Sequence, residues 1–403
     1  MSFEGWKKVR WGDLATLEYG KSLKEYRNSK GIIPVFGTNG QIGFTDKPLC
    51  NAAGVIIGRK GAYRGVHYSE TPFFVIDTAF YLKPKISQLD IKYAYYELLT
   101  QNINDMDSGS AIPSTSREDF YNLSVHLPPF KTQHRIASIL SSLDDKIELN
   151  RQTNQTLESI AQALFREWFV DFNFPGATGK MQDSELGRIP KDWKIKKIKD
   201  VVELIKGVSY RSSELMPSDI ALVTLKSINR GGGFNFSGFK EFNGKYKALQ
   251  ELLPGELIFA QTDITQNADV IGSPAIVENP FGYTKLVASI DIVKCKIKDL
   301  DISQGFLYAL LSLPTFKDYC ISHTNGSTVL HLKSSAVYDF KFIMPELDIL
   351  NKYSKMAMAI RERIMVINLE IQTLTQLRDT LLPKLMKGEI SIPETEQQIA
   401  AAI

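Results

Sequence analysis

The sequence predicts an α/β (α+β) protein in which two copies of a globular domain are joined by two long antiparallel coiled-coil helices, as a pseudo-two-fold internal repeat. Three observations predict this fold class. Identical residues recur at a constant distance along the chain, each copy ends in a long apolar seam of helical spacing, and strand-like runs surround one apolar-periodic helix in each globular part. A chain of 403 residues is long enough for such domains at ~100 to 200 residues each.

The repeat is defined by identical residues separated by a constant number of positions along the chain. Five residues recur in order in this way: Trp6, Asp13, Leu17, Gly20 and Ser22 recur as Trp193, Asp200, Leu204, Gly207 and Ser209. A second, larger offset relates Gly109-Ser110, Tyr121 and Pro128 to Gly326-Ser327, Tyr338 and Pro345. The second globular part is therefore the longer one. Two copies are too few for a solenoid, which leaves a pseudo-two-fold pair.

Each globular part is predicted to contain short strands and one main helix. In the first part the strand-like runs are Ile32 to Phe36, Gly54 to Gly58, Phe73 to Ile76 and Leu123 to Leu127, with a helix from about Ile91 to Leu99. In the second they are Ile220 to Leu225, Glu256 to Ala260, Leu286 to Val293 and Tyr338 to Met344, with a helix from about Gln304 to Tyr319. Turn-rich loops separate them.

Each helical part carries an a/d seam. Apolar residues alternate four and three apart from Ile136 to Trp168, and an equivalent seam runs from Tyr353 to Leu385. About 40 residues at ~1.5 Å rise make a rod of roughly 60 Å. Because a globular part separates the two helices along the chain, we expect them to pair with each other, antiparallel. The predicted domains are 1–130 and 176–345 (globular), 131–175 and 346–390 (helical), and 391–403 (a tail).

Composition narrows the function classes. Lys plus Arg number 48 against 45 Asp plus Glu, a net charge of +3, but basic residues concentrate in 1–70 and 173–211. Two basic regions suggest two polyanion contacts, and the alternative is solvated lysines on strand edges. The 3 cysteines make no disulfide framework, which favours a reducing, cytoplasmic setting. No apolar run of ~18 residues occurs, so we expect neither export nor a membrane span.

Several segments together resemble the specificity subunit of type I restriction-modification systems. These are Gly109 to Pro113, Leu127 to Phe130, Gln133 to Leu140, and Asn150 to Asn154 continuing from Leu157 to Phe169. The loops from Gly37 to Gly43 and from Gly54 to Gly65 look like those of a common variety of target-recognition domain. Two departures are Thr132-Gln133, where the family usually has Glu-Gln, and Leu350-Asn351 in the second copy.

The resemblance implies a DNA-binding subunit without catalysis or cofactor of its own. Each target-recognition domain would read one half of a bipartite asymmetric site in double-stranded DNA. The helices would bind two modification subunits, which methylate adenine with S-adenosylmethionine. A restriction/translocase subunit would add ATP- and Mg-dependent cleavage. Two alternatives are a coiled-coil scaffold that does not bind DNA and the specificity part of a related fused restriction enzyme.

The residues agree that this chain lacks catalytic motifs. Adenine methylation needs a polar residue before Pro-Pro-aromatic, and Leu127 stands at that place. No phosphate-binding G-x-x-x-x-G-K-[ST] motif occurs. The 5 histidines are scattered without metal-ligand spacing, so we expect no metal site.

Turn residues are the candidate DNA contacts. In the first domain they are Thr38, Asn39, Arg59, Lys60 and Arg64, and in the second Lys226, Arg230, Thr262 and Asp263. An arginine in such a turn can fork onto a guanine edge or a phosphate. The alternative is that these are exposed hairpin charges without a partner.

Seam residues are the candidate partner contacts and coiled-coil positions: Asn150, Asn154, Leu157, Leu164, Trp168, Phe169, Ile367 and Ile371. Asparagine in an apolar seam fixes register at some cost in stability. We expect Asn150 and Asn154 to lie near Ile367 and Ile371, or else to face a groove where a modification subunit docks. Trp168 and Phe169 suit either core packing or an anchor for that subunit.

Overall fold

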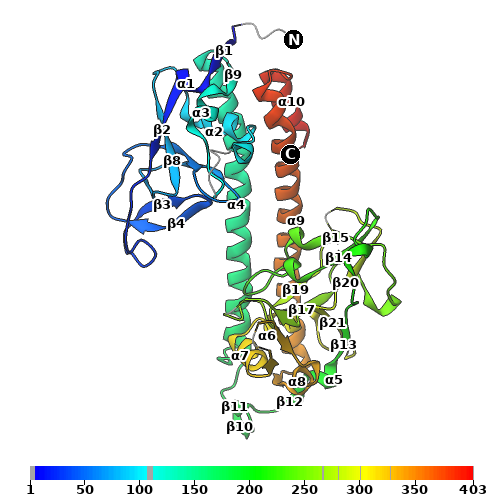
Figure 1. Cartoon of the computed structure of the whole chain (residues 1–403). Helices are drawn as coiled ribbons and strands as arrows, with labels where there is room; N and C mark the ends of the chain where they lie inside the picture. Colours follow the sequence, from blue (N-terminus) through cyan, green and yellow to red (C-terminus); the bar gives the residue numbers. More distant parts are fainter. Residues whose placement is uncertain are drawn as a thin grey trace. The chain divides into compact units, whose positions relative to one another are not determined.

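The computed structural model describes residues 5–402 except 107–111, 266, 280, 300 and 327. The chain divides into two compact units: a first unit of Met1–Asn150 with Glu370–Ile403, and a second unit of Arg151–Leu369. Each unit contains one globular part and a portion of both long helices, α4 (Phe130–Phe169) and α9 (Leu347–Met386) (Figure 1). Gly109 to Ala111 and Ser327, which carry part of the predicted repeat motif, lie outside the described residues.

The globular part of the first unit contains three sheets. The strands of the pair β1-β9 are Lys7–Arg10 and Ser124–Leu127. The sheet β2-β8-β5-β6 is built from Ala15–Tyr19, Ala79–Pro84, Gly54–Gly58 and Val66–Ser69. The sheet β4-β3-β7 is built from Gly40–Thr45, Ile33–Gly37 and Phe74–Val75. The helices are α1 (Trp11–Leu14), α2 (Ile91–Leu99), η1 (Ile103–Asp105) and α3 (Arg117–Asn122).

The second unit repeats this order of elements. Its pair β12-β24 consists of Lys194–Lys197 and Lys341–Met344, and its sheet β13-β21-β17-β19 of Val202–Lys206, Ile292–Ile297, Leu257–Ala260 and Pro274–Ile276. The sheet β15-β14-β20-β16 consists of Phe239–Glu241, Ile220–Val223, Lys285–Ala288 and Glu251–Leu252. The helices α5 (Ile198–Val201), α6 (Gln304–Leu311) and α8 (Ser334–Asp339) correspond to α1, α2 and α3.

Extra elements make the second globular part longer. They are the hairpin β10-β11 (Met181–Ser184, Gly187–Pro190), the strands β18 (Thr262–Asp263), β22 (Thr324–Asn325) and β23 (Leu330–Leu332), and helix α7 (Pro314–Ser322). Short 3-10 turns are η2 (Ser212–Glu214), η3 (Leu225–Ser227), η4 (Phe236–Gly238) and η5 (Ala248–Gln250).

The recurring residues make equivalent bonds in both units, which confirms the internal repeat. The Leu17 amide donates to the Tyr121 hydroxyl at 3.1 Å, and the Leu204 amide donates to the Tyr338 hydroxyl at 2.9 Å. A Cβ on Gly20 would lie 2.0 Å from the Ile76 carbonyl oxygen, and one on Gly207 would lie 2.0 Å from that of Ser289. A side chain would therefore push two closely approaching backbone segments apart at the same place in each domain.

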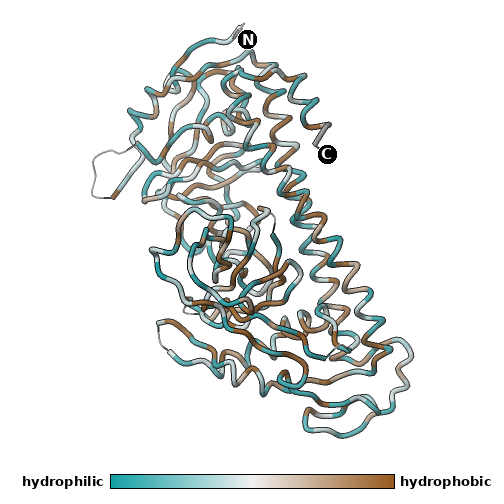
Figure 2. Tube along the Cα trace, turned by 90° about the vertical axis from the view of Figure 1, so that its right-hand side faces the viewer, coloured by the Kyte–Doolittle hydropathy of each residue, from teal (hydrophilic) through white to brown (hydrophobic). Residues whose placement is uncertain are grey.

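The long helices pack against each other within each unit. In the first unit Ile136, Leu140 and Leu143, near the start of α4, share a buried cluster with Leu374, Leu381 and Leu385, near the end of α9. In the second unit Phe165 and Trp168, at the end of α4, pack with Tyr353, near the start of α9. Both pairings are antiparallel, as predicted. Hydrophobic and hydrophilic residues alternate along both helices (Figure 2).

A further helix follows α9 at the end of the chain. The segment expected to be a tail forms helix α10 (Ile392–Ala402), and Ile392 and Ile399 pack against the helix cluster of the first unit. The predicted tail is thus helical, and its apolar residues Ile392 and Ile399 lie on the cluster seven positions apart. The exact domain boundaries stay predictions. Along the described part of the chain, no helix combines the length and apolarity needed to cross a membrane.

Candidate nucleic-acid interface

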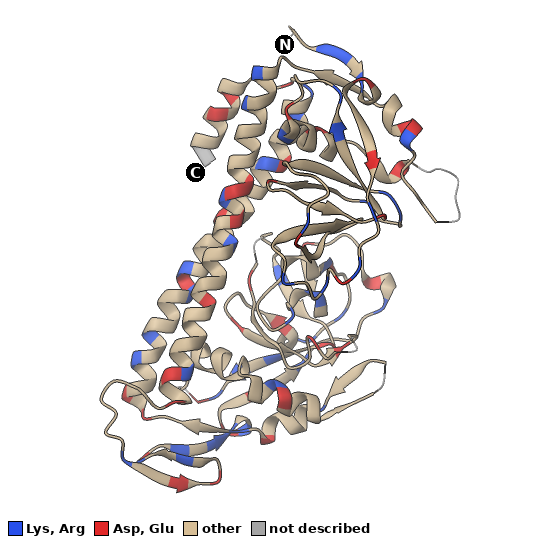
Figure 3. Ribbon diagram, turned by 90° about the vertical axis from the view of Figure 1, so that its left-hand side faces the viewer, with Lys and Arg blue, Asp and Glu red and all other residues tan. Residues whose placement is uncertain are grey.

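A concave surface of the first unit gathers basic and aromatic side chains at the end of β5. We call it the Arg59 pocket. It has a volume of about 670 Å³ and is lined by Tyr19, Arg59, Lys60, Phe80, Ile112, Ser114, Thr115, Ser116, Arg117 and Glu118. Basic segments also occur among the loops of both globular parts, with acidic segments between them (Figure 3).

Backbone bonds hold the turn that carries Arg59. Its amide donates to the Thr78 carbonyl at 2.9 Å, and its carbonyl accepts from the Thr115 amide at 2.9 Å. The Thr38 hydroxyl bonds the carbonyl oxygens of Lys60, at 2.9 Å, and Thr78, at 2.7 Å. Thr38 therefore supports the turn from inside, whereas Lys60 is exposed.

Two guanidinium groups share one tyrosine ring in this pocket. The Arg59 Cζ lies 4.9 Å from the centre of the Tyr19 ring, and Arg59 Nη1 donates to the Asp77 carbonyl at 2.7 Å. The Arg117 Cζ lies 5.3 Å from the same ring, and its Nε donates to the Tyr121 hydroxyl at 3.3 Å. Hydrogen bonds with Tyr121 and Tyr19 raise the pKa of Arg117. Two fixed cations at one opening suit a nucleic-acid edge or a phosphate.

Sequence reasoning missed Tyr19 and Arg117. Tyr19 ends strand β2, and Arg117 is the first residue of α3, closely behind the Gly109 to Pro113 motif. Proximity to that motif was the available signal for Arg117. Asn39 is exposed on the β3–β4 turn, and its amide, in the orientation that satisfies its bonds, donates to the Tyr63 carbonyl at 2.6 Å.

The prediction that Arg64 contacts DNA is corrected by its burial. The side chain is 2% exposed. Its guanidinium donates to the carbonyl oxygens of Gly61, Ile103, Asn104 and Met106 at 2.7 to 3.3 Å. Arg64 therefore fastens the β5–β6 loop to the segment after α2 and has no surface to offer a ligand.

In the second unit the predicted contacts separate into exposed and buried groups. Lys226 and Arg230 are exposed, and Arg230 lies 3.4 Å from Asp269. The loop beyond Arg230 holds three consecutive glycines with φ of 81°, 111° and 89°, a conformation that favours glycine. Both cations remain available at the surface.

Thr262 and Asp263 are corrected for the same reason as Arg64. The Thr262 hydroxyl donates to Asp291 at 2.8 Å. Asp263 is fully buried and accepts from the amides of Thr265, Val270 and Ile271. Burial opposes its charge, but these bonds outweigh burial and hold its pKa below the usual value. The pair shapes the loop after β17 and does not face solvent.

The two seam asparagines lie in different units and differ in their bonds, and their closeness to Ile367 and Ile371 stays a prediction. Asn154 Nδ2 donates to Asn368 Oδ1 at 2.7 Å, beside the predicted Ile367, and Asn368 bonds Glu278 at 3.2 Å. Asn150 is buried, and its Nδ2 has no hydrogen-bond partner among the described residues. Ile367 is buried in the second unit, and Ile371 packs on the helix cluster of the first. The polar seam in the second unit is thus an Asn–Asn–Glu chain.

The aromatic end of α4 is core. Trp168 and Phe169 are 7% and 5% exposed and belong to the main cluster of the second unit, on which Leu164 also packs. Phe169 lies 5.0 Å from Tyr353, ring centre to ring centre. The interpretation as an anchor for a partner is corrected, because these rings are already covered. Leu157 is half-buried on the same helix.

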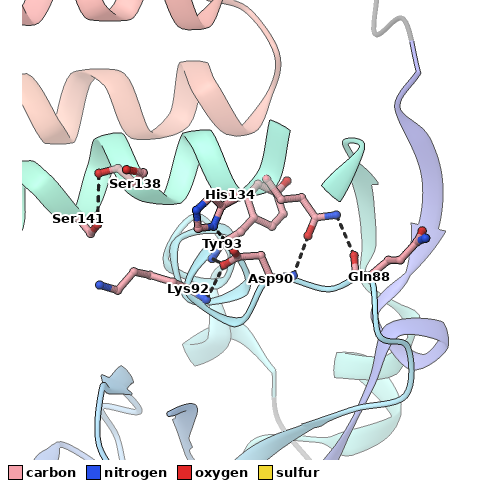
Figure 4. Close-up of polar contacts among 8 residues, drawn as sticks. Gln88, Asp90, Lys92, Tyr93, His134, Ser138 and Ser141 are labelled. Atoms are coloured by element: carbon pink, nitrogen blue, oxygen red, sulfur yellow. Dashed lines mark hydrogen bonds and ion pairs between the residues drawn. The ribbon is translucent and has the colours of Figure 1, made fainter. Parts of the chain in front are cut away.

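Helix α4 is fixed to the first globular part by a polar junction around Asp90 (Figure 4). The buried Gln133 side chain accepts from the Asp90 amide at 2.9 Å and donates to the carbonyl oxygens of Gln88, at 3.1 Å, and Pro128, at 2.9 Å. The Asp90 carboxylate caps α2 and contacts His134 at 3.0 Å. The first globular part is thereby oriented on helix α4.

Comparison with known proteins decides the family. The family described as "Type I restriction modification DNA specificity domain" matches residues 3–159 and 190–365. The chain belongs to this family. Each match covers one globular part with much of the helix behind it, so this specificity protein carries two target-recognition domains and the predicted resemblance is confirmed.

Named specificity subunits are similar to this chain in sequence or in fold. The type I restriction enzyme MjaIX specificity subunit of Methanocaldococcus jannaschii is 27% identical over 75% of this chain and 70% of its own. The HindI specificity subunit of Haemophilus influenzae is 24% identical over 73% of this chain and 74% of its own. The crystal structure of the S subunit from M. genitalium has the same fold, with a TM-score of 0.60 and 18% identity, over 94% of this chain and 96% of that one.

Proposed function

We infer that this specificity subunit binds double-stranded DNA and that each target-recognition domain reads one half of a bipartite, asymmetric site. The observation that carries this proposal is the Arg59 pocket, where Arg59 and Arg117 are held on Tyr19 at the end of a strand. Lys60 borders the pocket, and Lys226 and Arg230 are exposed in the second unit. Phosphate contacts would position the DNA and arginine forks would select bases.

The long helices serve as spacer and as docking surface for two modification subunits. Apolar side chains on the outside of the helices in the second unit support this role: Ile160, Met358, Val366 and Leu369 are half exposed or more. Exposed apolar patches are typical of protein interfaces. The occupants would be methyltransferases that use S-adenosylmethionine, joined by restriction/translocase subunits that use ATP and Mg.

The chain itself acts without catalysis, in the cytoplasm, where the DNA of a prokaryotic host lies. The family match supports this division of roles, in which methyl transfer and cleavage belong to the partner subunits and this chain determines the DNA sequence at which they act.

The test combines the chain with a modification partner. Mapping N6-methyladenine in a host that carries both should reveal one bipartite motif, and the DNA affinity of the purified complex should fall steeply with salt because lysines and arginines displace counterions. A coiled-coil scaffold would instead yield a partner complex with no methylated motif and no salt-dependent gel shift.

A further inference from the structure

The two domains place different side chains at one equivalent backbone position. The Arg59 amide bonds the Thr78 carbonyl at 2.9 Å, and its carbonyl accepts from Thr115 at 2.9 Å. In the second unit the Gln261 amide bonds the Asp291 carbonyl at 2.8 Å, and its carbonyl accepts from Leu332 at 2.8 Å. Each residue directly follows a central strand, β5 or β17. Arg59 and Gln261 are therefore structural equivalents.

A second position accompanies the first in both units. Arg117 is the first residue of α3, and Ser334 is the first residue of α8. Arg117 shares the Tyr19 ring with Arg59, and the Ser334 hydroxyl contacts Gln261 Oε1 at 3.4 Å. Side chains from the same two places thus approach each other in each domain, although their chemistry differs.

The way in which the Arg59 guanidinium is held favours contact with a base edge over contact with a phosphate. One guanidinium nitrogen is bound to the Asp77 carbonyl and the group lies near the Tyr19 ring, yet Nε and Nη2 have no hydrogen-bond partner in the part of the chain that the structure describes. A fixed fork with two free donors suits a planar acceptor edge, whereas a phosphate contact needs no such orientation. Gln261 likewise is partly buried, and its Nε2 has no hydrogen-bond partner among the described residues.

We propose that these paired positions, Arg59 with Arg117 and Gln261 with Ser334, are the specificity-determining pair of each domain. The first domain then selects a guanine through its O6 and N7, and the second selects an adenine through its N6 and N7, the edges that arginine and glutamine match. This inference rests on the proposed function and adds the base that each domain reads.

The experiment gives the first domain the pair of side chains that the second domain carries. The double variant Arg59→Gln with Arg117→Ser is expressed with the modification partner, and the methylated motif is mapped across the host genome. One G·C pair in one half-site should change, while the other half-site stays the same. On oligonucleotides, the wild type should lose about five- to 150-fold in affinity when that guanine is replaced, as expected for a bidentate contact of ~1–3 kcal/mol.

Further variants keep the test valid if the double variant fails to fold, and one of them is a control for loss of charge. Arg117→Lys keeps the charge without the fork, so it should lower discrimination at that base pair and preserve the melting temperature. Gln261→Arg with Ser334→Arg should alter the other half-site alone. Lys83→Gln changes an exposed lysine on β8, outside both pairs and outside both basic regions, and should leave the motif and affinity as they were.

Distinct outcomes decide between the two claims. An unchanged motif in both double variants, or an affinity loss that is equal for all sequences, would overturn the base-reading assignment and leave a phosphate contact. Absence of any methylated bipartite motif with the wild-type chain and its partner would instead overturn the proposed function.

Discussion

The two units bury opposite chemistry at equivalent places. In the first unit Glu97, on α2, accepts from Trp11 Nε1 at 2.9 Å and from Gln101 Nε2 at 2.6 Å. The corresponding residues of the second unit, on α5 and α6, are Ile198 and Leu310, and both are buried. At the start of the long helices Gln133 in the first unit corresponds to Leu350 in the second, and both are buried too.

This difference teaches that one fold tolerates two ways of attaching a recognition domain to its helix. Directional hydrogen bonds fix the angle of the first domain, but they require that each partner stays satisfied. Apolar packing holds the second domain and makes no such demand. The first unit should therefore be the more sensitive to loss of a single group and to pH, and four predictions test this from the largest expected effect to the smallest.

Gln133→Leu, which copies the second unit, should have the largest effect. It removes three hydrogen bonds and leaves the Gln88 and Pro128 carbonyls and the Asp90 amide without their partner in a buried junction. With three unsatisfied groups at ~1–3 kcal/mol each, the first unit should lose about 3–9 kcal/mol, measured by native-state hydrogen exchange. Gln162→Leu, at an exposed position of the same helix, is the control. An equal effect of both variants would contradict the junction's role.

Glu97 should make the first unit pH-dependent. Burial raises its pKa to about 7, against 4.5 for an ordinary glutamate, although the bonds from Gln101 and Trp11 oppose the shift. The folded state therefore binds a proton that the unfolded state has released, and its stabilisation, complete below pH 4.5, is lost as pH rises through 7. The loss should amount to about 3 kcal/mol. Glu97→Gln should abolish this slope and gain stability at pH 8.

The second unit supplies the internal control for that titration. Leu310 occupies the equivalent place, so the peptides of α6 should exchange with a much weaker dependence on pH than those of α2 over the same range. Parallel slopes in the two units would show that Glu97 is not the group responsible.

The packing of α4 against α9 in the first unit also depends on an ion pair. Asp144, on α4, contacts Arg378 of α9 at 2.7 Å and accepts from the Tyr96 hydroxyl at 2.6 Å. Because the Asp144 side chain is 30% exposed, solvent screens the pair, and Asp144→Asn should destabilise the first unit by only about 1–2 kcal/mol. Asp348→Asn, which disrupts the exposed pair with Lys352, should change stability by less than about 0.5 kcal/mol. Thermal melts of the two variants make the comparison.

The sequence could predict the repeat, the seams and the antiparallel pairing because each depends on periodic or recurring residues. It could not predict which turn cations are exposed. Arg59 and Arg64 stand in the same loop, yet only tertiary contacts with Ile103 and Met106 bury Arg64. The role of Gln133 was equally hidden, since its partners come from loops distant in sequence and a lone glutamine carries no periodic signal.

The smallest effect should come from the two seam asparagines, which sequence periodicity treats as alike. Asn150→Ile removes a buried amide whose Nδ2 has no partner among the described residues, so the first unit should gain about 1 kcal/mol. Asn154→Ile instead removes the donor to Asn368 and should cost the second unit about 0.5–1.5 kcal/mol. Hydrogen exchange resolves the units separately, and a gain of stability in both units would show that the Asn154–Asn368 bond contributes nothing. Opposite signs would establish that one asparagine is a cost to its helix pair and the other a polar link between helices.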